Sequence, residues 1–298
     1  MIESIKNFDW MGNNTKKQTI EKIKTIKSVI GISKDDKNDE FLNKFYADIK
    51  IGSTFIETLM EAKSFNTKLM FRSLFLKHGV DDMLAHTLTN EANASYDLRF
   101  NMMNMNPGIF RLPFFAKNAT DVELFGQLGY IVSHEFTHAL GPNGMRFDKE
   151  GNFNKKNEDG SLENYNKKIE AVHEKVDRIC AKTVRNKKTG EKENFTPVFA
   201  NVAGEIMADL GGVNYSFKAF VLHRGGNVTR SERIKFFKST ALLFCQKESD
   251  EKLLKSASGI LHPPEYCRVN VISHTRLFEG INRCRRKNSD LTIEMWSD

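Results

Sequence analysis

The segment Ser133-His134-Glu135-Phe136-Thr137-His138 decides the fold of this chain. Residues four apart in a helix lie on one face, one turn from each other, so the imidazoles of His134 and His138 can converge on a single metal ion. Glu135 then lies beside that ion, where a carboxylate can serve as the base for a water molecule. The pattern predicts a zinc site of the kind that metallopeptidases use.

The flanking sequence favours a helix around this segment. Thr120 and Glu123 have the spacing of a capping box, and Gly141 is a candidate C-cap. Apolar residues follow at helical spacing: Leu124, Phe125, Leu128, Ile131 and Val132. The alternative interpretation is a surface helix that carries two histidines by coincidence.

A catalytic zinc site needs a third protein ligand and leaves the fourth position to water. The segment from Asn201 to Asp209 offers one, because Glu205 and Asp209 are four residues apart on one helical face, with Asn201 as a candidate N-cap. Glu205 completes a His2Glu set, and Asp209 can hold a ligand histidine in its tautomer. Such a pair is common on solvated helices. Here the apolar segment Leu210–Val213 follows, which indicates that the two acids are buried. Buried acids need a partner, and a zinc ion with its histidines would be one.

Four motifs in order resemble the neprilysin and endothelin-converting-enzyme family of zinc metallopeptidases. They are Asn93-Ala94-Ser95-Tyr96 with Pro107-Gly108-Ile109 and Pro113-Phe114-Phe115, then His134–His138, then Gly204–Asp209, then His262-Pro263-Pro264-Glu265-Tyr266-Cys267-Arg268. The resemblance spans nearly the whole chain. It implies a zincin-type (thermolysin-like, gluzincin) catalytic lobe.

The resemblance implies one Zn²⁺ per chain, bound by His134, His138 and Glu205. It implies Glu135 as the general base and Asp209 as the support of His134. Each role agrees with the chemistry, because zinc polarises the scissile carbonyl while a carboxylate moves the proton to the leaving amine.

The resemblance also implies a substrate-binding set. His262 would donate to the oxyanion, and Arg268 would bind the substrate backbone or its C-terminal carboxylate. Asn93 and the Ala94 carbonyl would bind the peptide as an extended strand. Met102–Met105 fits such an edge strand or, alternatively, a buried run. The pocket for the residue after the cleaved bond would be apolar: Ile109, Phe114, Ile131 and Phe244.

Patterning predicts a mainly α fold with a small β-sheet. The expected helices are Asn14 to Ile30, Asp39 to Tyr46, Gly52 to Phe75, Thr120 to Leu140, Leu162 to Val184, Asn201 to Leu222 and Thr229 to Gln246; the expected strands are Ser95 to Asn104 and Phe147 to Phe153. We expect residues 1–90 to be a helical lead-in region and residues 91–298 to be the zinc metallopeptidase domain.

Composition excludes several classes of protein. The 298 residues are 40% hydrophobic and 28% charged, which is ordinary for a globular chain. The net charge is +7, but the basic residues are not interleaved with aromatic residues as they are in nucleic-acid-binding modules. We expect no membrane segment and no signal peptide within this sequence. The resemblance nevertheless implies a plasma-membrane or extracellular enzyme acting on peptides, with an N-terminal lobe that this chain lacks.

Four cysteines suit a secreted enzyme: Cys180, Cys245, Cys267 and Cys284. The resemblance implies that Cys245 and Cys284 pair with the N-terminal lobe. The family counterpart of Cys180 pairs with a cysteine at the C-terminus, and no cysteine follows Cys284 here, so that bond cannot form. Cys267 is additional to the family pattern.

Two functions remain open. The first is a zinc endopeptidase that cuts oligopeptides before a hydrophobic residue. The alternative is a catalytically impaired homologue or fragment that binds peptides or a partner. Gly141-Pro142 stands where the family has an acid that supports the second histidine, and Ile260 replaces an acid two residues before His262. A structural helical protein with coincidental motifs is a third class.

Overall fold

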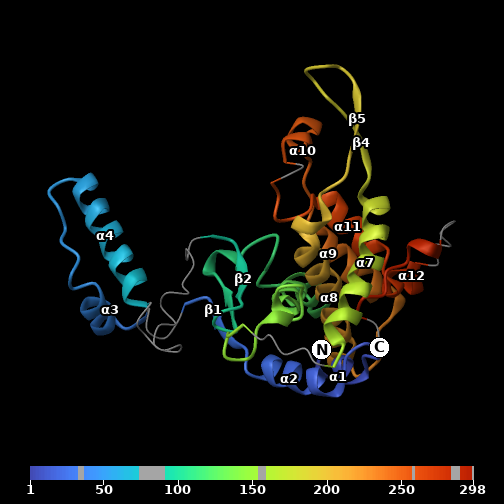
Figure 1. Cartoon of the computed structure of the whole chain (residues 1–298), viewed down its shortest axis with the longest axis horizontal. Helices are drawn as coiled ribbons and strands as arrows, with labels where there is room; N and C mark the ends of the chain where they lie inside the picture. Colours follow the sequence, from blue (N-terminus) through green and yellow to red (C-terminus); the bar gives the residue numbers. More distant parts are fainter. Residues whose placement is uncertain (33–36, 74–90, 154–158, 257–258, 283–288, 297–298) are drawn as a thin grey trace.

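The computed structural model describes residues 1–32, 37–73, 91–153, 159–256, 259–282 and 289–296. Its helices are α1 (Ile2–Asn7), α2 (Asn13–Lys24), α3 (Asp39–Phe45), α4 (Phe55–Ser73), α5 (Asp121–Leu124), α6 (Tyr130–His138), α7 (Ser161–Cys180), α8 (Phe199–His223), α9 (Arg230–Leu242), α10 (Asp250–Ser256), α11 (Glu265–Ser273) and α12 (Arg276–Asn282) (Figure 1). The strands are β1 (Lys27–Ile30), β2 (Ala94–Asp97), β3 (Met102–Met105), β4 (Lys182–Arg185) and β5 (Lys192–Phe195). The predicted mainly α fold with a small sheet is confirmed.

The three-stranded sheet has the order β1-β3-β2, with β1 parallel and β2 antiparallel to β3. The single strand predicted from Ser95 to Asn104 is wrong, because the chain turns back between β2 and β3. Asn101 at this turn has a φ of 48°, which asparagine tolerates better than most residues. All four residues of β3 are buried, so the buried alternative for Met102–Met105 is confirmed. The edge strands of the described sheet are β1 and β2, and β2 is the one that contacts α6.

Two predicted helices extend into segments that form strands; the helices predicted to end at Leu140 and Gln246 also stop earlier, at His138 and Leu242. Helix α2 stops before the expected limit at Ile30 because Lys27–Ile30 pairs with β3 as β1. Helix α7 stops before Val184, which is buried in β4 and pairs with β5. Both extensions contain β-branched residues, which fit a pleated strand, and strand pairing outweighs the helical pattern. The region Phe147 to Phe153 forms one isolated bridge between its ends.

The other predicted helices correspond to α3, α4, the segment from α5 to α6, α8 and α9; the predicted end at Phe75 lies outside the described residues. The capping box of Thr120 and Glu123 is confirmed. Asn201 is not the N-cap of α8, which begins two residues earlier, after Val198. Gly141 is not a C-cap either. Helix α6 ends at His138, and the Gly141 amide donates to the His138 carbonyl in a tight turn (3.1 Å).

Helices α6 and α8 approach closely through glycines. A Cβ added at Gly211 would lie 2.3 Å from the Thr137 side chain, and one at Gly212 would lie 3.0 Å from the Tyr130 ring. Any larger residue would separate the two helices. Between α5 and α6 the chain continues as a π-helical segment, Phe125–Gly129, without a break. The close contact puts the acidic face of α8 opposite the histidines of α6.

The N-terminal segment belongs to the main core. Ile5, Phe8, Trp10 and Met11 are buried in one cluster with residues of α7 and α8 and with Trp296. Together with β1, this makes residues 1–30 part of the body that carries α6. The domain boundary at residue 90 lies outside the described residues and stays a prediction.

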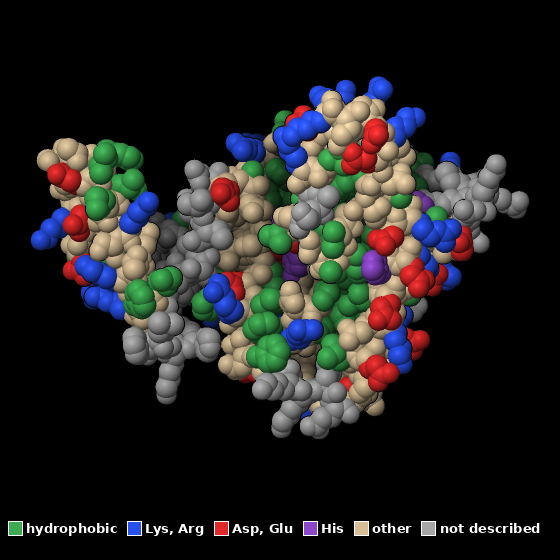
Figure 2. Space-filling view, turned by 45° about the horizontal axis from the view of Figure 1, so that its top comes forward, with side chains coloured by type: hydrophobic (Ala, Val, Ile, Leu, Met, Phe, Trp, Pro, Cys, Tyr) green, Lys and Arg blue, Asp and Glu red, His purple; other side chains and the backbone are tan. Residues whose placement is uncertain are grey.

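Helices α3 and α4 form an arm beside this body, at the left of Figures 1 and 2. Hydrophobic side chains are exposed on it, among them Phe55, Ile56, Met60 and Phe71. Figure 2 shows hydrophobic side chains among charged ones on this arm. The arm therefore does not contribute to the main core.

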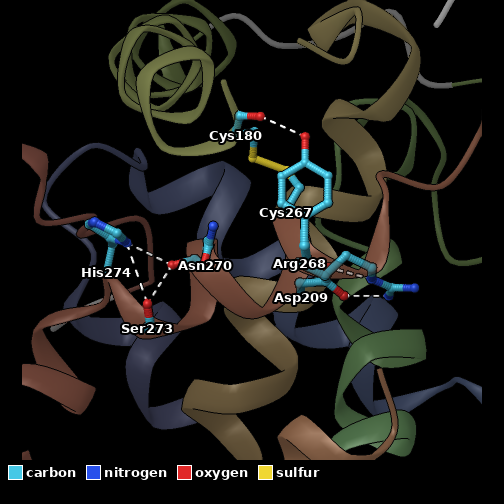
Figure 3. The surroundings of a disulfide bond; sticks show 8 residues. Cys180, Asp209, Cys267, Arg268, Asn270, Ser273 and His274 are labelled. Atoms are coloured by element: carbon cyan, nitrogen blue, oxygen red, sulfur yellow. Dashed lines mark hydrogen bonds and ion pairs between the residues drawn. A yellow bond between two sulfur atoms is a disulfide. The ribbon is translucent and has the colours of Figure 1, made fainter. Parts of the chain in front are cut away.

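A disulfide joins Cys180, at the end of α7, to Cys267 on α11 (Figure 3). Neither cysteine was expected to pair within this chain, so this bond is seen only in the structure. Tyr266, next to Cys267, donates from its hydroxyl to the Cys180 carbonyl (2.7 Å), so the start of α11 is attached to α7 twice. Cys245 is exposed and free, and Cys284 lies outside the described residues.

We expect replacement of both Cys180 and Cys267 by serine to lower the free energy of unfolding by about 2–5 kcal/mol. The bond closes a loop with a sequence separation of 87 residues, which restricts the unfolded chain. Urea unfolding under non-reducing conditions measures this difference. Cys245→Ser is the matched control and should change little. Equal stability of the double variant and the parent would contradict the prediction.

Candidate metal centre

Two histidines of α6 and one glutamate of α8 meet at the surface of contact between these helices. The Nε2 atoms of His134 and His138 are 3.1 Å apart. Glu205 places Oε2 at 3.2 Å from His134 Nε2 and Oε1 at 3.5 Å from His138 Nε2. The structure thus brings together the three residues that the sequence predicts as ligands.

The donor set fits a zinc ion. Tetrahedral coordination with bonds of about 2.0–2.1 Å separates neighbouring donor atoms by about 3.3–3.4 Å, and the three distances lie around that value. Glu205 Oε2 is buried and accepts no hydrogen bond of suitable geometry from the described residues, as expected of an oxygen reserved for a cation. Glu135 also lies within 4.8 Å of the histidine nitrogens, so its carboxylate borders the candidate metal site.

Asp209 lies beside the Nδ1 atom of His134, the ring nitrogen that does not face His138 and Glu205. It is fully buried, and its Oδ1 lies 3.0 Å from His134 Nδ1. The Tyr130 hydroxyl donates to the same oxygen, and Arg268 donates through Nε to Oδ2 (2.8 Å) and through its terminal nitrogen to Oδ1 (Figure 3). Burial alone would raise the pKa of Asp209, but Arg268 and His134 outweigh it and hold this pKa well below its usual range. Asp209 is therefore an anion beside His134.

The ligand protonation states follow from burial and from neighbouring charges. Burial and the neighbouring His134 lower the pKa of His138 to about 4, which leaves this imidazole neutral. Burial would raise the pKa of Glu205, but the histidines lower it to about 2. For His134, burial is outweighed by Asp209 and Glu205, and the pKa rises to about 10.

Glu135 differs from the other carboxylates of the site. It is 6% exposed, and burial raises its pKa to about 7, with His134 and Arg268 opposing and Glu205 reinforcing the shift. A carboxylate with a pKa near neutrality can both take up and release a proton under ordinary conditions.

A cavity of about 510 Å³ opens at the centre, between α6, α8, α11 and the edge strand β2. Its lining includes every predicted substrate-binding residue: Asn93, Ala94, Arg268, Ile109, Phe114, Ile131 and Phe244. His262 also lines it, is largely exposed, and places Nε2 at 3.4 Å from Glu205 Oε2. The Arg268 guanidinium stacks on the Phe244 ring (4.6 Å) while it binds Asp209.

Sequence reasoning missed some residues of the site. Tyr130, whose hydroxyl reaches Asp209, stands four residues before His134 on the same helical face, and this spacing is a signal that could have found it. Tyr96 and Glu265 also line the cavity; both stand inside motifs quoted above, which gave them no role. Leu243 lines it too, without a signal in the sequence pattern.

The family model of peptidase family M13 matches residues 93–292, which contain all of these site residues. The chain belongs to peptidase family M13. It is 26% identical to Neprilysin-3 of Drosophila melanogaster and 25% identical to the endothelin-converting enzyme homolog of Locusta migratoria, over 98% of this chain in both cases. The predicted family is thereby confirmed.

A solved structure of the zinc metalloprotease ZMP1 from Mycobacterium tuberculosis matches 99% of this M13 chain and 45% of its own, with a TM-score of 0.82 at 18% identity. The predicted zincin fold is therefore confirmed. The chain covers only 37% of Neprilysin-3 and 40% of the locust protein, less than half of their lengths. Within the described part of this M13 chain, no helix combines the length and the apolarity needed to cross a bilayer.

Proposed function

We propose that this M13 chain is the catalytic part of a zinc-dependent metalloendopeptidase. The observation that carries the proposal is the convergence of His134, His138 and Glu205 at distances of 3.1–3.5 Å, with the buried Glu135 beside them. These three residues would hold one Zn²⁺. When bound, zinc supplies Lewis-acid polarisation of a peptide carbonyl and lowers the pKa of a water molecule.

The residues of this chain would then move the protons. Glu135 would accept a proton from the attacking water and deliver it to the nitrogen of the leaving amine. His262, at the mouth of the cavity, would donate a hydrogen bond to the oxygen that gains negative charge. Asp209 would keep His134 in the tautomer that leaves Nε2 available to the metal.

The substrate would be an extended peptide. The edge strand β2 lies beside α6, and Asn93 and Ala94 at its start line the cavity, which supports backbone pairing with the peptide. Ile109, Phe114, Ile131 and Phe244 make the adjoining wall apolar, which supports a preference for a hydrophobic residue after the cleaved bond. Arg268 would interact with the peptide only through donor groups that Asp209 leaves unused.

A plasma-membrane or extracellular location is also proposed, by similarity to neprilysin. The disulfide between Cys180 and Cys267 supports it, because such bonds persist in oxidising compartments.

The alternative function is peptide or partner binding by an impaired homologue. It is favoured by Gly141, which lines the cavity in the turn directly after His138 and contributes no carboxylate there. Loss of a supporting acid costs roughly 10–100-fold in metal affinity or activity in metal sites generally. The two functions differ in whether the chain cleaves the peptides that it binds.

We expect the purified chain to bind one zinc ion and to cleave quenched fluorescent peptides that carry Leu or Phe after the cut. Treatment with 1,10-phenanthroline should abolish cleavage, and added Zn²⁺ should restore it, because all three ligands belong to this chain. The measurements are metal analysis and initial rates, with a peptide carrying Asp at that position as the control. A chain that binds less than stoichiometric zinc and cleaves neither peptide would contradict the proposal.

A further inference from the structure

Lys22 on α2 is a buried cation that binds the loop following the metal helix. Its side chain is 4% exposed. The Nζ atom donates to the carbonyls of Ala139 (3.3 Å), Gly144 (2.7 Å) and Phe147 (2.9 Å). An ammonium group has three donors, and each has an acceptor here, which offsets the cost of burying the charge.

The loop that Lys22 binds covers the last turn of α6, the turn that carries His138. A Cβ on Gly144 would lie 2.0 Å from the His138 carbonyl oxygen, so the loop folds directly back onto that residue. Residues 141–144 line the cavity. Helix C-termini carry partial negative charge on unpaired carbonyls, and a cation at this end stabilises the helix.

The main chain of Lys22 is tied to the opposite wall of the cavity. Asn101 donates from its side-chain amide to the Lys22 carbonyl (3.1 Å) and accepts a hydrogen bond from the Tyr96 hydroxyl. Tyr96 lies on β2 and lines the cavity. One residue of α2 therefore connects the loop behind His138 with the strand proposed to bind the peptide.

We propose that Lys22 is a positioning residue for the metal centre: by holding the loop from Ala139 to Phe147, it fixes His138 in the chain that lacks a supporting acid at Gly141. The inference rests on the proposed zinc function. It assigns a role to α2, which lies outside residues 93–292 matched by the family model. Burial lowers the pKa of Lys22 to about 8, with Asp148 opposing, so the lysine is still mostly protonated at neutral pH.

Lys22→Met tests this role because methionine retains an unbranched apolar side chain and removes all three donors. We expect the dissociation constant of zinc for this variant, measured by chelator competition on the folded protein, to rise about 10-fold. This increase lies within the range seen when a residue that holds a metal ligand in place is lost. Amide hydrogen exchange of the metal-free protein should quicken over residues 139–147. Lys24→Met, on an exposed position of the same helix, is the matched control.

Unchanged zinc affinity and loop exchange in Lys22→Met would overturn the inference, even if the variant melts at a lower temperature. Lys22→Gln, which keeps two donors on a shorter side chain, should bind zinc with intermediate affinity. If the methionine variant fails to fold, zinc affinity and amide exchange of the loop are measured on the glutamine variant instead. A parent chain that binds zinc but cleaves no peptide would count against the proposed peptidase and leave this comparison intact.

Discussion

Replacing Glu135 by glutamine is expected to lower kcat by roughly 10²–10⁴-fold while zinc remains bound. Glutamine has nearly the same shape but cannot accept a proton from water. Glu135 is buried beside the ring nitrogens of His134 and His138, so bulk water has little access to take over its role as proton acceptor. Steady-state kinetics on the quenched peptide, together with zinc analysis of the same sample, measure both expected results.

The matched control for this prediction is Glu163→Gln on an exposed position of α7, which should leave kcat unchanged. If Glu135→Gln cleaves as fast as the parent, another group moves the proton and the proposed role is wrong. If neither protein cleaves but both bind the peptide equally, the alternative of an impaired peptide-binding homologue is favoured.

Removal of the Asp209 side chain has the second large expected effect. Asp209→Ala should destabilise the fold by about 3–5 kcal/mol, because it leaves the buried Arg268 without the carboxylate that accepts two of its hydrogen bonds. It should also weaken zinc binding by roughly 10–100-fold, because His134 loses the carboxylate oxygen that lies 3.0 Å from its Nδ1. Urea unfolding and chelator competition separate the two consequences.

A double variant distinguishes the stabilising role of Asp209 from its metal-directed role. Combining Asp209→Ala with Arg268→Met removes both charges, so part of the lost stability should return. Zinc affinity should stay low, because His134 is still unsupported. Zinc affinity equal to that of the parent in either variant would show that Asp209 does not orient His134.

The sequence was sufficient to predict which side chains lie together where the residues belong to the same helix. His134 and His138 share a face because they are four apart, and Glu205 and Asp209 do so for the same reason. Their motifs indicated a metal site and the family, and the structure brings all four side chains together. Local patterns failed at element ends such as Lys27–Ile30, where a strand partner more than 70 residues away overrides the helical pattern.

The sequence by itself determined the candidate metal ligands, the family and the mainly helical fold, because helical spacing and ordered motifs are properties of short segments. Only the tertiary structure decided what supports the H-E-x-x-H helix: Tyr130 and Arg268 on Asp209, the bond between Cys180 and Cys267, and Lys22 on the loop after His138. These partners are distant along the chain and meet only because burial forces each polar group to find a partner. The spacing of residues within one segment does not predict which of these distant partners meet.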